Sequence, residues 1–116
     1  MGISGLVFDE AMSRLAGQMN GLGEDPRLEP IIDLMTGRQR GLLVDSLLER
    51  VAVFSKEPRE LSPGDVSEIS RLMRRANARR ALLYVPMTTS VPNPVKLLAA
   101  LSKIEIVRVN APETDA

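Results

Sequence analysis

The amino-acid sequence predicts an α/β fold (or an α+β one) in which a helical N-terminal segment packs on a small, mostly parallel, three-stranded sheet with two crossover helices. Three observations favour this fold. Apolar residues recur with a helical period in the first half, two short apolar runs in the second half resemble buried strands, and a helical stretch separates those runs. We therefore expect a single domain over residues 1–116, made of a helical segment 1–50, a β-α-β-α-β segment 51–110 and a polar tail 111–116.

The first helix is predicted over about residues 5–20. Its apolar residues are spaced four, three, four and three positions apart, which places them on one helical face: Phe8, Met12, Leu15, Met19 and Leu22. The run Asn20–Gly23 then ends the helix, because its two glycines accept left-handed backbone conformations.

Two further helices are predicted before residue 50. One begins at Asp25-Pro26, where a capping residue precedes a proline at the first helical position. Its apolar residues are Leu28, Ile31, Ile32, Leu34 and Met35. Thr36-Gly37 marks a bend, and a third helix is expected from about Arg38, with Leu43, Leu47 and Leu48 on its inner side.

The run Val51-Ala52-Val53-Phe54 is ambiguous on its own. The spacing of Leu47, Val51 and Phe54 continues a helix, whereas composition and length suit a buried strand. Two isolated parallel strands are not stable, so the sheet needs a third strand. We interpret residues 51–54 as that strand; the alternative is a strand contributed by a second copy of the chain.

A helix is predicted over residues 63–80. Ser62 has the position of an N-cap and Pro63 that of the first helical residue. Asp65 is the third helical residue, whose carboxylate can accept a hydrogen bond from the backbone N–H of the N-cap. The apolar run 81–85 follows as a buried strand.

The last elements are a helix and a strand. Asn93-Pro94 is a second cap-plus-proline start, and it leads into a helix over residues 94–102. The final strand holds Ile104, Ile106, Val107 and Val109.

Composition narrows the chemistry. Neither cysteine nor histidine occurs, which excludes thiol nucleophiles, disulfides, the usual zinc sites and histidine general bases. Nuclease sites with an acid on one strand and Glu-x-Lys on the next also lack their motif, because Lys56-Glu57 and Lys103-Ile104-Glu105 have the wrong order. These absences predict a protein that is not an enzyme and has neither a metal nor a cofactor.

Five arginines precede the run 81–85 in a chain whose formal net charge is zero. They form the predicted partner- or nucleic-acid-binding surface: Arg71, Arg74, Arg75, Arg79 and Arg80. On a helix over 63–80, three of them follow at i, i+4 and i+8. The pattern fits a solvated face that complements the helix dipole, a docking surface for an acidic protein, or a nucleic-acid contact. A pI near 6.3 and 3% aromatic residues place nucleic acid second to a protein partner.

The loop 86–93 is a possible anion-binding site. In parallel sheets, ligands bind beyond the carboxyl ends of the strands, where helix N-termini present free N–H groups. The candidate residues are Thr88, Thr89, Ser90 and Asn93. The loop matches no phosphate-binding fingerprint, however, and Asn93 is also explained as a helix cap.

These features predict a non-enzymatic interaction or assembly module that acts as a homo-oligomer or as a subunit of a larger complex. Self-association is expected because the predicted sheet is small and the charge is uneven: residues 1–62 carry seven basic and ten acidic side chains, residues 63–110 eight basic and three acidic. The alternative is a nucleic-acid-binding or regulatory protein that uses the arginine-rich helix 63–80. With no apolar stretch of about 18 residues and no signal peptide, we expect a cytoplasmic protein without membrane contact.

Overall fold

The structure, a computed structural model, describes residues 5–18, 27–46 and 49–109. These residues form three helices and one five-stranded sheet. The strands are β1 (Arg27–Ile32), β2 (Gln39–Asp45), β3 (Arg50–Ser55), β4 (Arg80–Pro86) and β5 (Ile104–Val109). The helices are α1 (Gly5–Gln18), α2 (Pro63–Arg75) and α3 (Asn93–Leu101). None of these helices is long and apolar enough to span a membrane.

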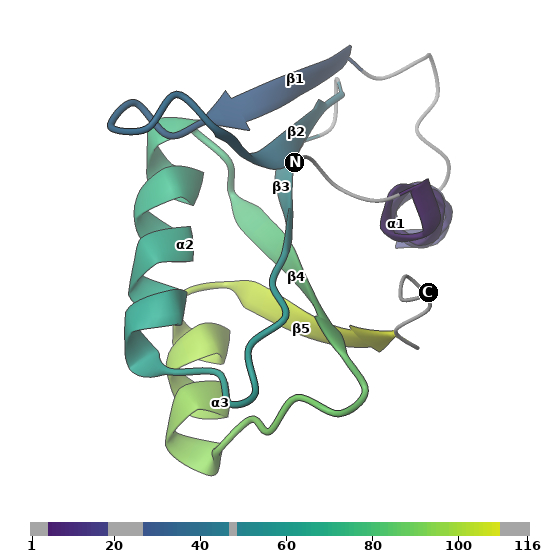
Figure 1. The fold of residues 1–116 in the computed structure, drawn as a ribbon. Coiled ribbons are helices and arrows are strands. Elements are labelled where there is room, and N and C mark those ends of the chain that lie inside the picture. The colour runs from purple at the N-terminus through teal and green to yellow at the C-terminus, as the bar shows by residue number, and fades with distance from the viewer. Residues whose placement is uncertain (1–4, 19–26, 47–48, 110–116) are drawn as a thin grey trace.

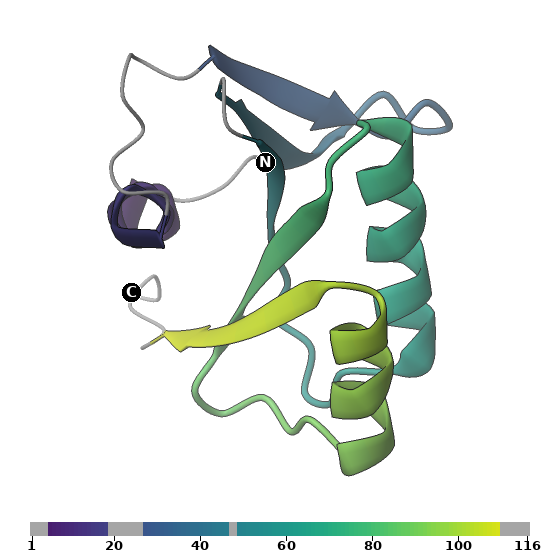
Figure 2. The ribbon, with the colours of Figure 1, turned by 180° about the vertical axis from the view of Figure 1, so that it is seen from behind.

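The sheet is mixed, and its strands lie side by side in chain order. β1, β2 and β3 pair antiparallel, whereas β3, β4 and β5 pair parallel because α2 and α3 supply the crossovers. Figure 1 shows three layers: α1 covers one face of the sheet, and α2 and α3 cover the other. The view from behind shows the same arrangement (Figure 2).

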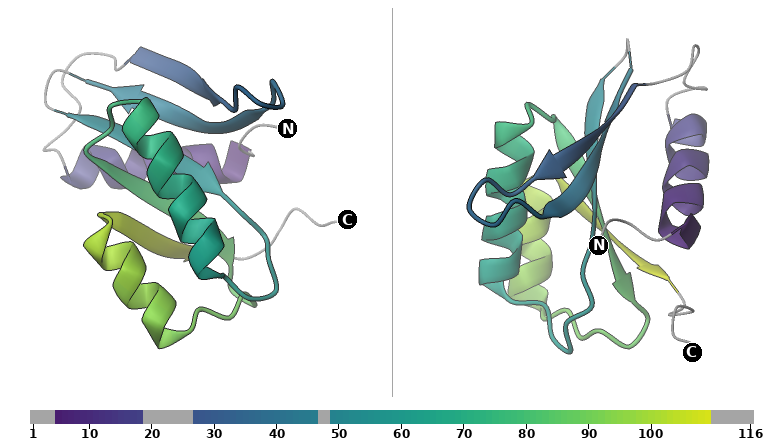
Figure 3. Two further views of the ribbon diagram at one scale, coloured as in Figure 1. Left: turned by 90° about the vertical axis from the view of Figure 1, so that its left-hand side faces the viewer. Right: turned by 45° about the horizontal axis from the view of Figure 1, so that its top comes forward.

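Each face of the sheet has its own core. On the side of α2 and α3, Phe54 and Leu83 are buried together with residues such as Leu72. On the side of α1, Leu82 and Tyr84 belong to a second cluster of buried apolar residues. Consecutive residues of a strand point to opposite faces, so the continuous apolar run of β4 follows from cover on both sides. Figure 3 shows α2 and α3 lying across one face and α1 on the far side.

The two helices predicted before residue 50 are wrong, because β1 and β2 lie within residues 27–45; the predicted helix start Asp25-Pro26 is outside the described residues. β2 is covered on both faces: Leu43 is buried in one core and its neighbour Val44 in the other. Such a strand lacks the alternation that distinguishes strands from helices. Pro30 fits β1 because β1 is an edge strand, where a missing N–H costs no ladder hydrogen bond. Leu47 and Leu48 lie outside the described residues.

The predicted three-stranded, mostly parallel sheet is also wrong, since this chain supplies five strands and the sheet is mixed. The antiparallel β1–β2 hairpin extends the parallel half at β3. The argument that an undersized sheet requires a second copy of the chain therefore fails.

The second half follows the prediction more closely. β3 confirms the interpretation of residues 51–54 as a strand. α2 begins as expected, because the Asp65 N–H donates to Ser62 Oγ at 3.1 Å and the Ser62 N–H donates to Asp65 Oδ2 at 2.9 Å. The helix ends at Arg75 rather than at residue 80, and Asn77, with a φ of 58°, adopts the left-handed conformation that follows many helix ends.

The start of α3 differs from the prediction by one position. Pro92 is the N-cap residue and provides no side-chain hydrogen bond, while Asn93 is already the first helical residue. The prediction that Asn93 caps this helix is therefore wrong.

α1 confirms the first predicted helix, and its buried face shares Leu15 with the predicted one but is shifted towards Val7 and Ala11. Val7, Ala11 and Leu15 are buried, while Phe8 and Met12 are half-buried. Met19, Leu22 and the predicted tail 111–116 lie outside the described residues. A polar contact also holds α1 in place: the hydroxyl of the buried Tyr84 donates to the Glu10 carboxylate, and Arg14 links Glu10 to Glu105 of β5.

Candidate functional site

The arginines predicted as a binding surface lie only partly on α2. Arg71, Arg74 and Arg75 are exposed, on the side of the helix away from the buried Ile69 and Leu72. Arg74 Nη2 donates to Ser70 Oγ at 3.2 Å, one turn earlier. These three arginines are called the α2 arginine face below.

Arg79 and Arg80 do not belong to that face, because the helix ends before them. Arg79 is exposed in the connection to β4, and its backbone N–H donates to Arg50 O. Arg80 opens β4, and its Nε lies 3.0 Å from Glu49 Oε2, with both side chains about three-quarters buried. Arg80 therefore has an internal partner, and the expected i, i+4, i+8 row does not form.

The α2 arginine face differs from most basic side chains of the sheet and α1 in lacking an acidic partner among the described residues. In the part of the chain that the structure describes, no carboxylate lies within ion-pair distance of Arg71, Arg74 or Arg75. Most other basic side chains on the sheet and α1 do have such a partner: Arg14, Arg27, Arg40, Arg50, Lys56 and Arg80. The positive charge of this face is thus directed at solvent.

A groove of about 270 Å³ adjoins this face, between β1 and the C-terminal end of α2. Arg50, Arg75 and Asn77 line it beside the apolar side chains of Ile31 and Leu72. Arg50 is fixed there, since its Nη2 donates to Ala76 O at 2.9 Å and its Nη1 lies 2.8 Å from Asp45 Oδ2. The lining of the groove is mixed in charge, because Glu29 also lines it and Arg50 is paired with Asp45.

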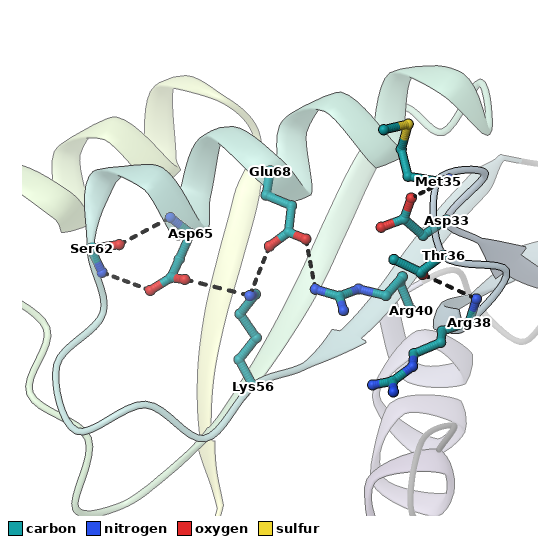
Figure 4. A network of polar contacts seen from close by, with 9 residues as sticks. All are labelled: Asp33, Met35, Thr36, Arg38, Arg40, Lys56, Ser62, Asp65 and Glu68. Carbon is teal, nitrogen blue, oxygen red and sulfur yellow. Dashed lines mark hydrogen bonds and ion pairs between the residues drawn. The ribbon is translucent and has the colours of Figure 1, made fainter.

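A second polar feature joins the sheet to the N-terminal half of α2. Lys56, directly after β3, places its Nζ 2.8 Å from Glu68 Oε1 and 3.4 Å from Asp65 Oδ1. Arg40 of β2 reaches the other oxygen of Glu68, with Nη2 2.6 Å from Oε2. Figure 4 shows these four side chains converging from three elements, and we call them the ion-pair cluster.

The cluster sits beside the β1–β2 hairpin. Asp33 is buried there, and its Oδ1 accepts a hydrogen bond from the Met35 N–H at 2.9 Å, which shapes the turn. Thr36 Oγ1 in the same turn accepts from the Arg38 N–H at 3.2 Å (Figure 4). The hairpin therefore has a defined conformation at the place where Arg40 enters the cluster.

The acids of the cluster are held in their charged form. Burial alone would raise the pKa of Glu68, but hydrogen bonds and charge from Lys56 and Arg40 outweigh it and lower that pKa. Burial likewise opposes ionisation of Asp65, yet its bonds to Ser62 and its contact with Lys56 lower its pKa. Both carboxylates are therefore ionised at neutral pH.

Acid should weaken this cluster. The folded pKa values lie below the ordinary values of 3.8 for Asp65 and 4.5 for Glu68, so the contribution to stability is present above those values and is lost as the pH falls through the lowered ones. We expect the free energy of unfolding, measured in urea, to drop from about pH 6 to about pH 3 by less in Glu68→Gln than in the wild type. Glu57→Gln, in an exposed position nearby, should behave like the wild type. An equal drop in all three proteins would contradict the assignment.

The loop 86–93 is organised largely by its own contacts. Thr89 is buried, and its hydroxyl donates to Pro58 O at 2.7 Å. Arg108 of β5 donates to Thr89 O at 2.6 Å, and the Ser90 N–H donates to Arg59 O. The side chains of Thr88, Ser90 and Asn93 are exposed. Anion binding at this loop stays a prediction, and Thr89 already uses its hydroxyl within the fold.

No protein-family model matches this chain, and no curated protein matches it. Among solved structures, SfsA from Pyrococcus furiosus in complex with Ca²⁺ has a TM-score of 0.53 and 14% sequence identity, over 90% of this chain and 53% of that one. EndoMS in its apo form has a TM-score of 0.45 and 21% identity, over 90% of this chain and 47% of that one. The chain spans about half the length of these structures, and the likeness to SfsA shows a shared fold.

This likeness corrects two predictions. The likeness to SfsA contradicts the interpretation as a non-enzymatic interaction or assembly module, which is wrong. The prediction that the chain is not an enzyme is wrong for the same reason. The absence of histidine and cysteine was not sufficient to exclude an enzyme, because carboxylates, lysine and arginine can act on phosphate groups without them. The alternative, a nucleic-acid-binding or regulatory protein, agrees better with the fold.

Proposed function

We propose that this chain binds nucleic acid and that the α2 arginine face is its principal contact. The observation that carries the proposal is the exposure of Arg71, Arg74 and Arg75 without an acidic partner among the described residues. Arginine binds phosphate oxygens through its planar fork of N–H donors, and such contacts supply most of the affinity of non-specific nucleic-acid binding.

Two further features support this function. The chain shares its fold with SfsA, and this likeness supports a nucleic-acid-binding protein better than an assembly module. The groove adjoins Arg75 at the C-terminal end of α2, which gives a nucleic-acid backbone a path from the α2 arginine face towards β1. The aromatic residues of the chain, Phe8, Phe54 and Tyr84, are buried or half-buried, which leaves phosphate contacts rather than base stacking to hold the ligand.

SfsA was solved with Ca²⁺, so the side chains of this chain must be tested against a divalent cation. Among the described residues, no three acidic side chains gather where they could hold a metal ion. Asp65 and Glu68, which share Lys56, already bind Lys56 and Arg40. The residues of the cluster do not fit a resident cation, and we derive no catalytic step through one.

Salt dependence tests the proposed function. Three arginines that each neutralise one phosphate give a log–log slope of affinity against salt of about −2.7 at roughly −0.9 per contact. Between about 50 and about 200 mM salt, the affinity for a fluorescein-labelled oligonucleotide should therefore fall about 40-fold. The variant Arg71→Ala/Arg74→Ala/Arg75→Ala should bind far more weakly, and fluorescence anisotropy across a salt series measures both effects.

A charge-matched variant separates the α2 arginine face from general attraction. Arg27→Ala/Arg59→Ala/Lys96→Ala removes the same charge from exposed positions outside α2 and should keep most of the affinity and the salt slope. Equal losses in the two triple variants would reject a localised interface. No detectable binding by the wild type at low salt would reject the proposed function.

A further inference from the structure

One ammonium group lies between two carboxylates in the ion-pair cluster. Lys56 Nζ is 2.8 Å from Glu68 Oε1 and 3.4 Å from Asp65 Oδ1, so oxygens from two turns of α2 face the same nitrogen. The remaining oxygens are also engaged: Asp65 Oδ2 accepts from the Ser62 N–H, and Glu68 Oε2 pairs with Arg40. Lys56 therefore has the central position in the cluster (Figure 4).

The charges of the cluster balance. Lys56 and Arg40 carry one positive charge each, and Asp65 and Glu68 one negative charge each. Divalent cations such as Ca²⁺ are attracted by carboxylates with uncompensated charge, which they bind through oxygens at about 2.3–2.6 Å. In the wild type, the Lys56 ammonium takes the position between the two oxygens, and it compensates, together with Arg40, the charge that would attract a cation.

We propose that the Lys56 ammonium is a built-in cation of this cluster, placed where a divalent cation would bind Asp65 and Glu68, so that the site is closed to Ca²⁺ until the ammonium is removed. The role of Arg40 is different, because it contacts only the outer oxygen of Glu68. Loss of Arg40 makes the cluster negative but leaves the ammonium between the carboxylates. Loss of Lys56 makes the cluster equally negative and also vacates the position.

This difference defines the test, which uses Ca²⁺ alone as the probe. Isothermal titration calorimetry compares the wild type with Lys56→Met and with Arg40→Met, two variants of identical net charge. We expect Lys56→Met to bind Ca²⁺ at least about tenfold more tightly than the wild type or Arg40→Met. Because the site offers few protein ligands, the dissociation constant should be in the weak range of about 10⁻⁴–10⁻³ M. The melting temperature of Lys56→Met should also rise with Ca²⁺, since a ligand that binds only the folded state stabilises it.

Two further variants place the binding. Adding Glu68→Gln to Lys56→Met should remove the gained affinity, whereas adding Glu57→Gln, an exposed acid outside the cluster, should not. Lys56→Gln should gain Ca²⁺ binding in the same way as Lys56→Met. If Lys56→Met is unfolded without Ca²⁺, we expect circular dichroism to show refolding as Ca²⁺ is added.

Several results would overturn the proposal. Equal gains in Lys56→Met and Arg40→Met would mean that net charge alone controls binding, and a wild type that binds Ca²⁺ as tightly as Lys56→Met would mean that the ammonium does not close the site. Failure of both Lys56→Met and Lys56→Gln to bind Ca²⁺ would show that the carboxylates are not a latent cation site. None of these measurements involves nucleic acid, so they are independent of the proposed function.

Discussion

Replacing Leu83 with alanine should lower the free energy of unfolding by about 2–5 kcal/mol. Leu83 is fully buried in β4, where it is paired with Phe54 of β3 and Ile106 of β5. Its side chain belongs to the core shared with α2 and α3, so truncation removes apolar contacts and leaves a cavity that close-packed neighbours fill only in part. Urea denaturation followed by circular dichroism measures the loss.

The same substitution at Leu97 is the control. Leu97 lies on α3 with 62% of its surface exposed, and Leu97→Ala should change the free energy of unfolding by no more than about 0.5 kcal/mol. Comparable losses at both positions would mean that α3 presents a different face to the sheet. A loss below about 1 kcal/mol at Leu83 would be incompatible with its burial in β4.

The parallel half of the fold was predictable because its local signals agree with its tertiary surroundings. Ser62, Pro63 and Asp65 form a helix start that depends on adjacent residues only, and the structure contains the capping box they predict. The run 81–85 is buried on both faces, so its continuous apolar character indicated a strand correctly.

The antiparallel half was not predictable by the same reasoning. The spacing of Leu43, Leu47 and Leu48 indicated a helix, but Leu43 belongs to a strand covered on both sides. The cover comes from α1 on one face and α2 on the other, and no local pattern shows this. Gly37, whose φ of 72° suits the hairpin turn, was interpreted as a bend between helices.

The candidate sites divide in the same way. Arg71, Arg74 and Arg75 were found because they are close in sequence and lie on one helix. The ion-pair cluster was missed because Arg40 comes from a strand that the sequence indicated as helical. The sequence did indicate that Lys56 follows a buried strand and that Glu68 lies on the next helix. Their contact, however, depends on how α2 packs on the sheet, which the sequence does not show.

Gly41 should tolerate no side chain, and Gly41→Ala should lower the free energy of unfolding by about 3 kcal/mol or more. A Cβ atom at this position of β2 would lie 2.6 Å from Phe54 Cδ1 and 2.8 Å from Val53 O. The first contact is with a buried ring and the second with the backbone of the paired strand β3, so neither can move away without disturbing the sheet. Thermal and urea denaturation of the purified variant measure the effect.

Two comparisons show whether the close approach of β2 to Phe54 is the cause. Gly64→Ala adds a methyl group that meets only Ser62 Oγ at 3.6 Å, so it should be neutral or stabilise by up to about 1 kcal/mol. Adding Phe54→Leu to Gly41→Ala should recover part of the lost stability, because the shorter side chain relieves one of the two close contacts while the contact with Val53 O persists. If the double variant lost the full sum of the single effects, the ring of Phe54 would not be the obstacle, and the contact with Val53 O alone would have to explain the loss in Gly41→Ala.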